Sequence, residues 1–140
     1  MPRIERNATV VWEGNVARGE GHITAGTGAF TALPYTLAGR ITSSPDKTSP
    51  EELLAAAHAA CLTTSIATEL TKAGTPPVHL EVACQIVMNE IEGQGHQIVE
   101  SHITIAGDAV PEDLLTIAHD GCPFSTLLRH AGVEITITQS

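Results

Sequence analysis

The segment SPEELLAAAHAACLTTSIATELTKAG, Ser49 to Gly74, is the part of the chain around which we expect the fold to be built. It predicts one long helix, because Ser49 suits the N-cap, Pro50 suits the first helical position, and Glu52 completes an S-x-x-E capping box. Gly74 suits the position just beyond the C-terminal end, and two prolines follow it. With a rise of 1.5 Å per residue, the predicted helix is roughly 35 Å long.

The first half of this predicted helix is apolar on every side, so we expect it to be buried. We do not expect a membrane span, because the apolar run is only about half of the roughly 20 residues that a bilayer requires. A chain of 140 residues does not easily surround such a helix by itself, which favours a homodimer of single-domain subunits (residues 1–140). His58 and Cys61 lie in the middle of the run, three positions apart and therefore on one face.

The composition excludes several classes of partner. Sixteen acidic and seven basic residues give a net charge of −9, which repels nucleic acid and anionic membranes, so we expect neither as a partner. The start MPRIERNATV lacks the apolar core of a signal peptide, which predicts a cytoplasmic protein. In that compartment, three cysteines argue for a catalytic or metal-binding pair and against a disulfide scaffold.

Short strands and helices flank the long helix, with hairpin-length links between the strands, which predicts an α+β fold. The expected strands are Thr9–Trp12, Gly19–Thr27, Pro34–Ile41, Leu80–Met88, Gln97–Ala106 and Val133–Thr138. The expected short helices are Pro111–His119 and Pro123–His130, and Glu92–Gly95 is expected to form a hairpin turn.

Two cysteines are candidates for a working pair. Cys122 precedes Pro123 at the predicted N-terminus of a helix, where unpaired N–H groups and the helix dipole favour a thiolate. Cys61 lies inside its helix and receives no such help from it. Taken alone, Cys61 is interpreted as a small buried core residue, unless a cation lies nearby.

Arg40 is the arginine closest in sequence to the start of the long helix, and Glu51 in the first turn could hold it through a bidentate ion pair. Glu51 and Cys61 are ten residues apart, or about 15 Å along the helix axis. An arginine anchored at Glu51 therefore reaches Cys61 of an antiparallel neighbouring helix more easily than Cys61 of its own. This spacing suggests a site shared between subunits.

A metal site is the main chemical alternative, because H-x-x-C occurs twice, as His58–Cys61 and as His119–Cys122. Two such pairs facing each other could hold zinc tetrahedrally, although neither matches a zinc-finger or zinc-ribbon pattern. Cys84, between Val82 and Ile86 on a predicted strand, is expected to belong to the core.

The segments SPEELLAAAHAACL and, some sixty residues later, GCPFSTLL together resemble the OsmC/Ohr family of thiol peroxidases. The N-terminal segments VWEG, RGEG and PY also resemble OsmC proteins, so the similarity extends over nearly the whole chain. The histidine in HAAC, His58, is typical of the OsmC branch. The resemblance implies an α+β fold in which antiparallel sheets enclose long central helices, in an intertwined homodimer with active sites at the subunit interface.

The resemblance also implies roles for individual residues. Cys61 matches the peroxidatic cysteine, Cys122 the resolving cysteine, and Glu51 the carboxylate that orients the active-site arginine. That arginine is Arg40 by the OsmC pattern, or Arg18 by the Ohr pattern. The implied activity, part of the response to oxidative stress, is reduction of small organic hydroperoxides, and less efficiently of hydrogen peroxide. An external dithiol restores the enzyme, with no metal or other cofactor. The alternative is a member of the same fold that binds hydrophobic ligands or lipids without turnover.

Overall fold

The computed structural model describes residues 3–140, so the first two residues of MPRIERNATV lie outside the described part. The chain divides into two compact units, an N-terminal unit of residues 1–50 and a C-terminal unit of residues 51–140. Each unit is described by itself below. The expectation of one domain over residues 1–140 stays a prediction.

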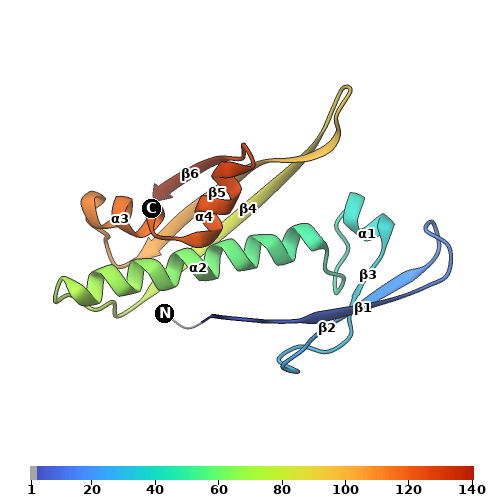
Figure 1. The fold of residues 1–140 in the computed structure, drawn as a ribbon, viewed down its shortest axis with the longest axis horizontal. Helices are drawn as coiled ribbons and strands as arrows, with labels where there is room; N and C mark the ends of the chain where they lie inside the picture. The colour runs from blue at the N-terminus through green and yellow to red at the C-terminus, as the bar shows by residue number, and fades with distance from the viewer. Residues whose placement is uncertain (1–2) are drawn as a thin grey trace. The chain divides into compact units, whose positions relative to one another are not determined.

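The N-terminal unit is a three-stranded antiparallel sheet in the order β1 (Ala8–Glu13), β2 (Glu20–Ala25) and β3 (Leu33–Tyr35) (Figure 1). The strands β1 and β2 agree with the predicted positions. The rings of Trp12 and Tyr35 lie 5.7 Å apart between centroids. Gly21 separates them on the central strand, and a Cβ added there would collide with the Tyr35 ring. The glycine therefore permits the two aromatic rings to approach each other.

The predicted third strand, Pro34–Ile41, is wrong beyond Tyr35. The strand ends at Tyr35, and a short helix, α1 (Leu37–Ile41), follows. Thr36 causes the change, because its Oγ1 accepts a hydrogen bond from the Gly39 N–H at 2.9 Å and so caps the helix. Arg40 consequently lies in the last turn of a helix and not at the end of a strand.

The long helix is confirmed as α2 (Pro50–Lys72). Its C-terminal end has the predicted form, since Gly74 adopts a φ of +83°. The N–H of Thr75 donates to the carbonyl of Leu70 at 2.9 Å, and the N–H of Gly74 donates to that of Thr71 at 3.0 Å. This pair of bonds is the Schellman motif, which satisfies carbonyl groups at the helix end.

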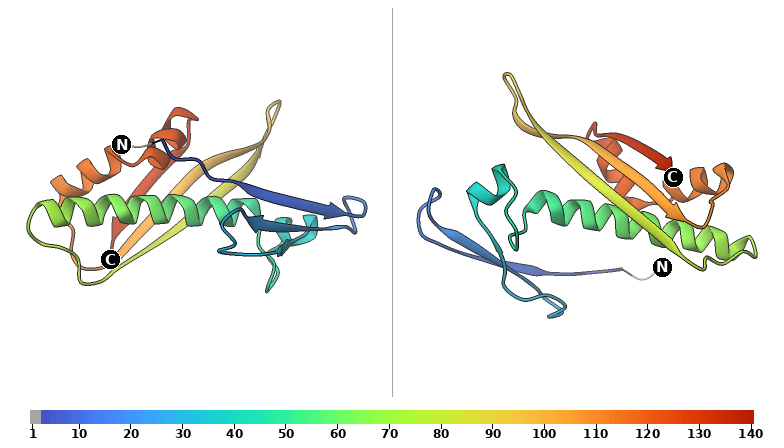
Figure 2. Two further views of the ribbon diagram at one scale, coloured as in Figure 1. Left: turned by 60° about the horizontal axis from the view of Figure 1, so that its bottom comes forward. Right: turned by 180° about the vertical axis from the view of Figure 1, so that it is seen from behind.

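In the C-terminal unit, α2 lies along a second sheet, formed by β4 (Leu80–Ile91), β5 (Gly95–Gly107) and β6 (Glu134–Gln139) (Figure 1). The strands β4 and β5 form the predicted hairpin, whose free end extends past the start of β6 (Figure 2). The expectation of purely antiparallel sheets is wrong here, because β6 pairs with β5 in parallel.

Two helices explain this parallel pairing. A chain that leaves β5 must return to its starting end before it can run parallel to it, which requires a long connection. The helices α3 (Glu112–Asp120) and α4 (Pro123–His130) provide this connection, and both begin and end within a residue of the predicted positions.

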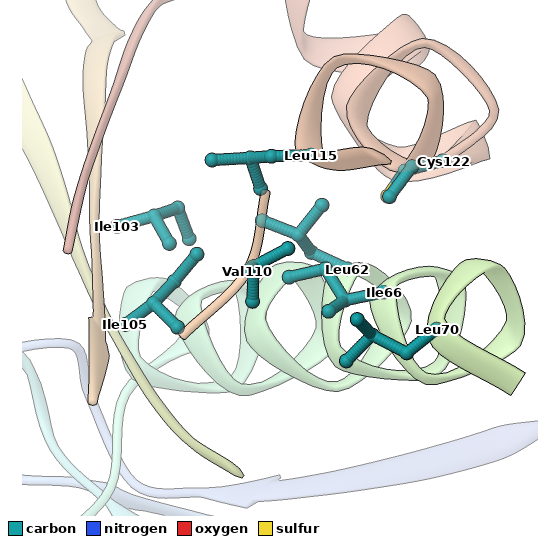
Figure 3. Packing of buried hydrophobic residues seen from close by; sticks show 9 residues of the cluster. Leu62, Ile66, Leu70, Ile103, Ile105, Val110, Leu115 and Cys122 are labelled. Atoms are coloured by element: carbon teal, nitrogen blue, oxygen red, sulfur yellow. The ribbon is translucent and has the colours of Figure 1, made fainter. Parts of the chain in front are cut away.

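The core of the C-terminal unit lies between α2, β5 and the helices α3 and α4 (Figure 3). Alternate residues of β5 face it, including Ile103 and Ile105, which are each 1% exposed. The cluster consists of Leu62, Ile66, Leu70, Ile103, Ile105, Val110, Leu115, Ala118 and Cys122.

The single chain does not bury α2 on all sides, and burial of its apolar first half by a second copy stays a prediction. Only one stripe, with one residue in every four, is buried: His58, Leu62, Ile66 and Leu70. The opposite stripe is exposed and consists of the small residues Ala56, Ala60, Thr64 and Thr68. By length and mean hydropathy alone, α2 would also qualify as a membrane span. Its buried stripe, however, packs against a sheet and two helices of its own unit.

Candidate active site

Cys122 occupies the N-cap of α4, as predicted. Its backbone is extended (φ −85°, ψ 112°), because a following proline disfavours the helical conformation, and Pro123 itself suits the first helical position. The Cys122 Sγ accepts a hydrogen bond from the Ser125 N–H at 3.5 Å. The residue is fully buried, and its side chain points toward α2 (Figure 3).

Cys61 of α2 meets Cys122 at this helix end. Cys61 packs against the cluster that contains Cys122, close enough for the Cys122 thiol and the backbone of Phe124, the second residue of α4, to shift its pKa. The first N–H groups of a helix have no partner within it. Here the Ser125 N–H donates to the Cys122 Sγ, and the Phe124 backbone lowers the pKa of the Cys61 thiol. Cys61 receives no help from the ends of its own helix, as expected, and the start of α4 lies beside it instead.

The protonation of Cys61 depends on opposing effects. Burial raises the pKa of the Cys61 thiol, and the hydrogen bond to Cys122 raises it further, whereas the Phe124 hydrogen bond lowers it. The pKa as a whole is raised, so these surroundings favour the thiol. A thiolate at Cys61 requires an additional positive charge.

His58 lies three residues before Cys61 and is completely buried. Its Nδ1 lies 2.7 Å from the Ser101 Oγ on β5, and its Nε2 lies 2.8 Å from the Ser125 Oγ on α4. Burial, and then the neighbouring His119, lowers the pKa of His58. The ring is therefore neutral near pH 7.

Sequence reasoning missed both serines. Ser101 occupies an inward position of β5, in line with Ile103 and Ile105, and a polar residue in that alternation was the available signal. Cys84 packs against the core as predicted, but its Sγ also lies 3.3 Å from the Ser101 Oγ. Burial raises the pKa of the Cys84 thiol, and the Ser101 hydrogen bond partly offsets this.

The zinc alternative, with His58, Cys61, His119 and Cys122 as ligands, is not supported. Both ring nitrogens of His58 bind serine hydroxyls, and Nδ1 of His119 lies 3.1 Å from the Ser125 Oγ. Across residues 3–140, no three His, Cys, Asp or Glu side chains form a group that could hold a metal ion. The histidines of the two H-x-x-C pairs therefore form hydrogen bonds to serine hydroxyls and do not face a common metal site.

The remaining predicted site residues lie in both units. Arg40 lines a cavity of about 260 Å³ within the N-terminal unit. The other residues that line it are Trp12, Val16, Tyr35, Thr36 and Leu37. Arg18 lies in the turn between β1 and β2, where its N–H binds the Asn15 Oδ1. Glu51 lies in the first turn of α2, at the start of the C-terminal unit. Its pairing with Arg40 stays a prediction.

Comparison with known proteins identifies relatives of this chain. Residues 43–138 match the family described as OsmC-like protein. The chain is 30% identical over 89 residues to the peroxiredoxin OsmC of Escherichia coli (strain K12), and equally to that of Shigella flexneri. These matches cover 64% of this chain and 62% of the length of each relative.

Solved structures show the same fold. The organic hydroperoxide resistance protein of Elizabethkingia anophelis gives a TM-score of 0.76 at 23% identity, over 100% of this chain and 99% of that chain. The protein OhrB of Bacillus subtilis gives 0.75 at 22% identity, over 96% and 98% of the two chains. With the family match over residues 43–138, we conclude that the chain belongs to the OsmC-like protein family.

Proposed function

We propose that the protein is a thiol peroxidase that reduces organic hydroperoxides, and less efficiently hydrogen peroxide. The observation that supports this most directly is the contact of the Cys61 and Cys122 thiols at the N-terminus of α4. The family of the chain includes thiol peroxidases, and a relative at 30% identity is named peroxiredoxin OsmC. A contacting thiol pair with donated N–H groups suits a cycle of cysteine oxidation and disulfide formation.

In the first step, the Cys61 thiolate attacks the terminal oxygen of the hydroperoxide. The O–O bond breaks, the alcohol leaves with one proton, and Cys61 becomes a sulfenic acid. Because burial raises the pKa of Cys61, this step requires a cation. Arg40, oriented by Glu51, provides it. The cavity beside Arg40 favours this arginine over Arg18, because its apolar residues suit the organic group of a hydroperoxide.

In the second step, Cys122 attacks the Cys61 sulfur. An S–S bond forms as the S–O bond breaks, and one water leaves. An external dithiol then reduces the disulfide by exchange and is itself oxidised. The cycle needs no metal or other cofactor.

The working unit we propose is a homodimer in the cytoplasm. The exposed stripe of Ala56, Ala60, Thr64 and Thr68 on α2 supports the dimer, because small residues allow a second helix to approach closely. The distance between Glu51 and Cys61 along α2, about 15 Å, supports a site to which both subunits contribute. The mass of the protein in solution checks the dimer. The free state of all three cysteines suits the reducing cytoplasm.

A hydrophobic-ligand binder without turnover is the second candidate, favoured by the apolar lining of the same cavity. The two candidates differ in what a peroxide does to the thiols. A peroxidase forms a disulfide between Cys61 and Cys122 when treated with cumene hydroperoxide, and a binder keeps its thiols.

Two serine variants test the proposed cycle. We expect Cys61→Ser to abolish peroxide turnover, because it removes the nucleophile. We expect Cys122→Ser to lose one thiol per subunit in a single oxidation and then to stop, because no resolving thiol remains. Thiol titration and mass spectrometry measure both outcomes. Cys84→Ser is the control for thiol number and should keep turnover. An unreactive Cys61 in the Cys122→Ser protein would contradict the cycle.

A further inference from the structure

A continuous chain of hydrogen bonds crosses the C-terminal unit through His58. It runs from the Cys84 Sγ to the Ser101 Oγ (3.3 Å) and on to His58 Nδ1 (2.7 Å). It continues from His58 Nε2 to the Ser125 Oγ (2.8 Å) and from there to His119 Nδ1 (3.1 Å). The five groups come from β4, β5, α2, α4 and α3 in turn. His58, in the centre, therefore connects the sheet to the first turn of α4.

Counting protons shows that this chain has a direction. A neutral imidazole donates one hydrogen bond and accepts one, and each serine hydroxyl donates one. When each hydroxyl donates to one neighbour in the chain and accepts from the other, the donors all point from Cys84 toward His119, or all point the other way. Within residues 3–140, every buried side-chain nitrogen and oxygen has a hydrogen-bond partner. Removing the ring of His58 would leave two buried hydroxyls, those of Ser101 and Ser125, without their central partner.

Ser125 connects this chain to the sulfur chemistry. Its hydroxyl binds His58, and its backbone N–H donates to the Cys122 Sγ. A shift of the Ser125 side chain therefore also shifts the N–H that binds the Cys122 sulfur, within the same helical turn. The side chain of Ser125 is fully buried, so water does not replace the hydrogen bond from His58.

We propose that His58 is a positioning residue for disulfide formation: through Ser125 it holds the first turn of α4, and with it Cys122, against Cys61. The inference rests on the proposed function and concerns its second step. Both ring nitrogens of His58 bind serine hydroxyls, so His58 acts on the cysteine pair through Ser125. It does so through the hydrogen bond between its Nε2 and the Ser125 hydroxyl.

The second step depends on such positioning. The sulfurs must close from a thiol contact to an S–S bond of about 2.05 Å, with restricted dihedral angles. If the first turn of α4 moves away, the Cys61 sulfenic acid persists. A second hydroperoxide then oxidises it to sulfinic acid, which a dithiol does not reduce. Loss of the hydrogen bond to Ser125 should therefore slow disulfide formation and increase over-oxidation, while the first oxidation stays as it was.

Two conservative variants separate the two hydrogen bonds of His58. The amide of His58→Gln reaches the position of Nε2 and restores the bond to Ser125. The amide of His58→Asn is shorter, matches Nδ1, and restores only the bond to Ser101. Sulfenic acid formation is measured with a sulfenic-acid trap after one equivalent of cumene hydroperoxide. Disulfide formation and sulfinic acid are followed by mass spectrometry.

We expect His58→Asn to form the disulfide about tenfold more slowly, the scale of one buried hydrogen bond, and to accumulate sulfinic acid. We expect His58→Gln to stay within about threefold of the wild-type rate and sulfenic acid formation to be the same in all three proteins. Equal disulfide rates in the two variants, or equal slowing of both steps, would overturn the inference.

If His58→Asn does not fold, Ser125→Ala and Ser101→Ala make the same comparison with the histidine in place. Ser125→Ala should slow disulfide formation more than Ser101→Ala does, and the reverse order would overturn the inference.

A readout without peroxide is the equilibrium of the Cys61–Cys122 disulfide with a glutathione buffer. Failure of wild-type Cys61 to react with peroxide would refute the proposed function alone. The glutathione equilibrium would still test the position of Cys122.

Discussion

The two H-x-x-C segments have the same spacing and different structures. His58 and Cys61 lie on one continuous helix, α2. His119 lies at the end of α3, and Cys122 lies beyond it at the N-cap of α4. The two segments nevertheless meet at one helix end. Both histidines bind the Ser125 hydroxyl, and Cys61 packs against the cluster that contains Cys122.

This difference shows how little a spacing alone specifies. In α2 the spacing of three follows from the helical repeat, which puts both side chains on one face. In the second segment the histidine and the cysteine do not share a helix. Pro123 makes the conformation of Cys122 extended, so Cys122 lies between α3 and α4. The same four residue types could hold zinc if they faced one another. Here each histidine is instead directed at a hydroxyl group.

The largest expected effect comes from removing the group that both segments share. Ser125→Ala leaves His58 Nε2 without its buried partner and removes a bond from His119. We expect the free energy of unfolding to fall by about 1–3 kcal/mol, as measured by urea denaturation. The control is Thr116→Ala on the exposed side of α3, for which we expect a change within about 0.5 kcal/mol. Equal effects of the two variants would mean that Ser125 does not join the segments.

The second effect is a loss of stability in mild acid. Burial lowers the pKa of both His58 and His119 in the folded state. The unfolded chain, whose histidines titrate near pH 6.5, therefore binds more protons below that pH, and stability falls as the pH drops through it. Each group contributes a slope of at most about 1.4 kcal/mol per pH unit.

Histidine variants assign this slope to the two segments. His58→Gln should flatten the dependence of stability on pH below about 6.5 more than His119→Gln, because His58 is fully buried and His119 is only partly buried. Urea denaturation at a series of pH values measures both slopes. A slope unchanged in His58→Gln would show that His58 does not resist protonation.

The smallest effect concerns the break between α3 and α4. Gly121 is the C-cap at which α3 ends, and it adopts a right-handed conformation (φ −89°, ψ 0°) that other residues can also adopt. An added Cβ would lie 3.3 Å from the carbonyl oxygen of Ile117, a tight contact that a small shift relieves. We expect Gly121→Ala to change the free energy of unfolding by less than about 1 kcal/mol and to leave the disulfide rate unchanged. A larger loss would show that the glycine, and not Pro123, determines the break.

Local signals predicted most of the elements. The proline and capping residues at the start of α2, Gly74 at its end and the two prolines beyond gave bounds that the structure confirms. The alternation in Leu80–Met88 and the glycines of the hairpin predicted β4 and its turn. The exception was PYTLAGRI, which was predicted as a strand and in which the capping oxygen of Thr36 starts a helix. The correct predictions and the wrong one all concern interactions between residues that are close together in the sequence.

The site was predictable in its residue types but not in its contacts. The candidates Cys61 and Cys122, and the place of Cys122 at a helix start, followed from neighbouring residues. The hydrogen bonds of His58 connect it to serines 43 and 67 positions away, and no spacing in the chain relates them. The parallel pairing of β6, the donation of an α4 N–H to Cys61 and the single buried stripe of α2 are also results of packing. Short-range sterics and capping act within a few residues and can be read from the chain. Which buried polar groups pair across the core depends on the complete fold.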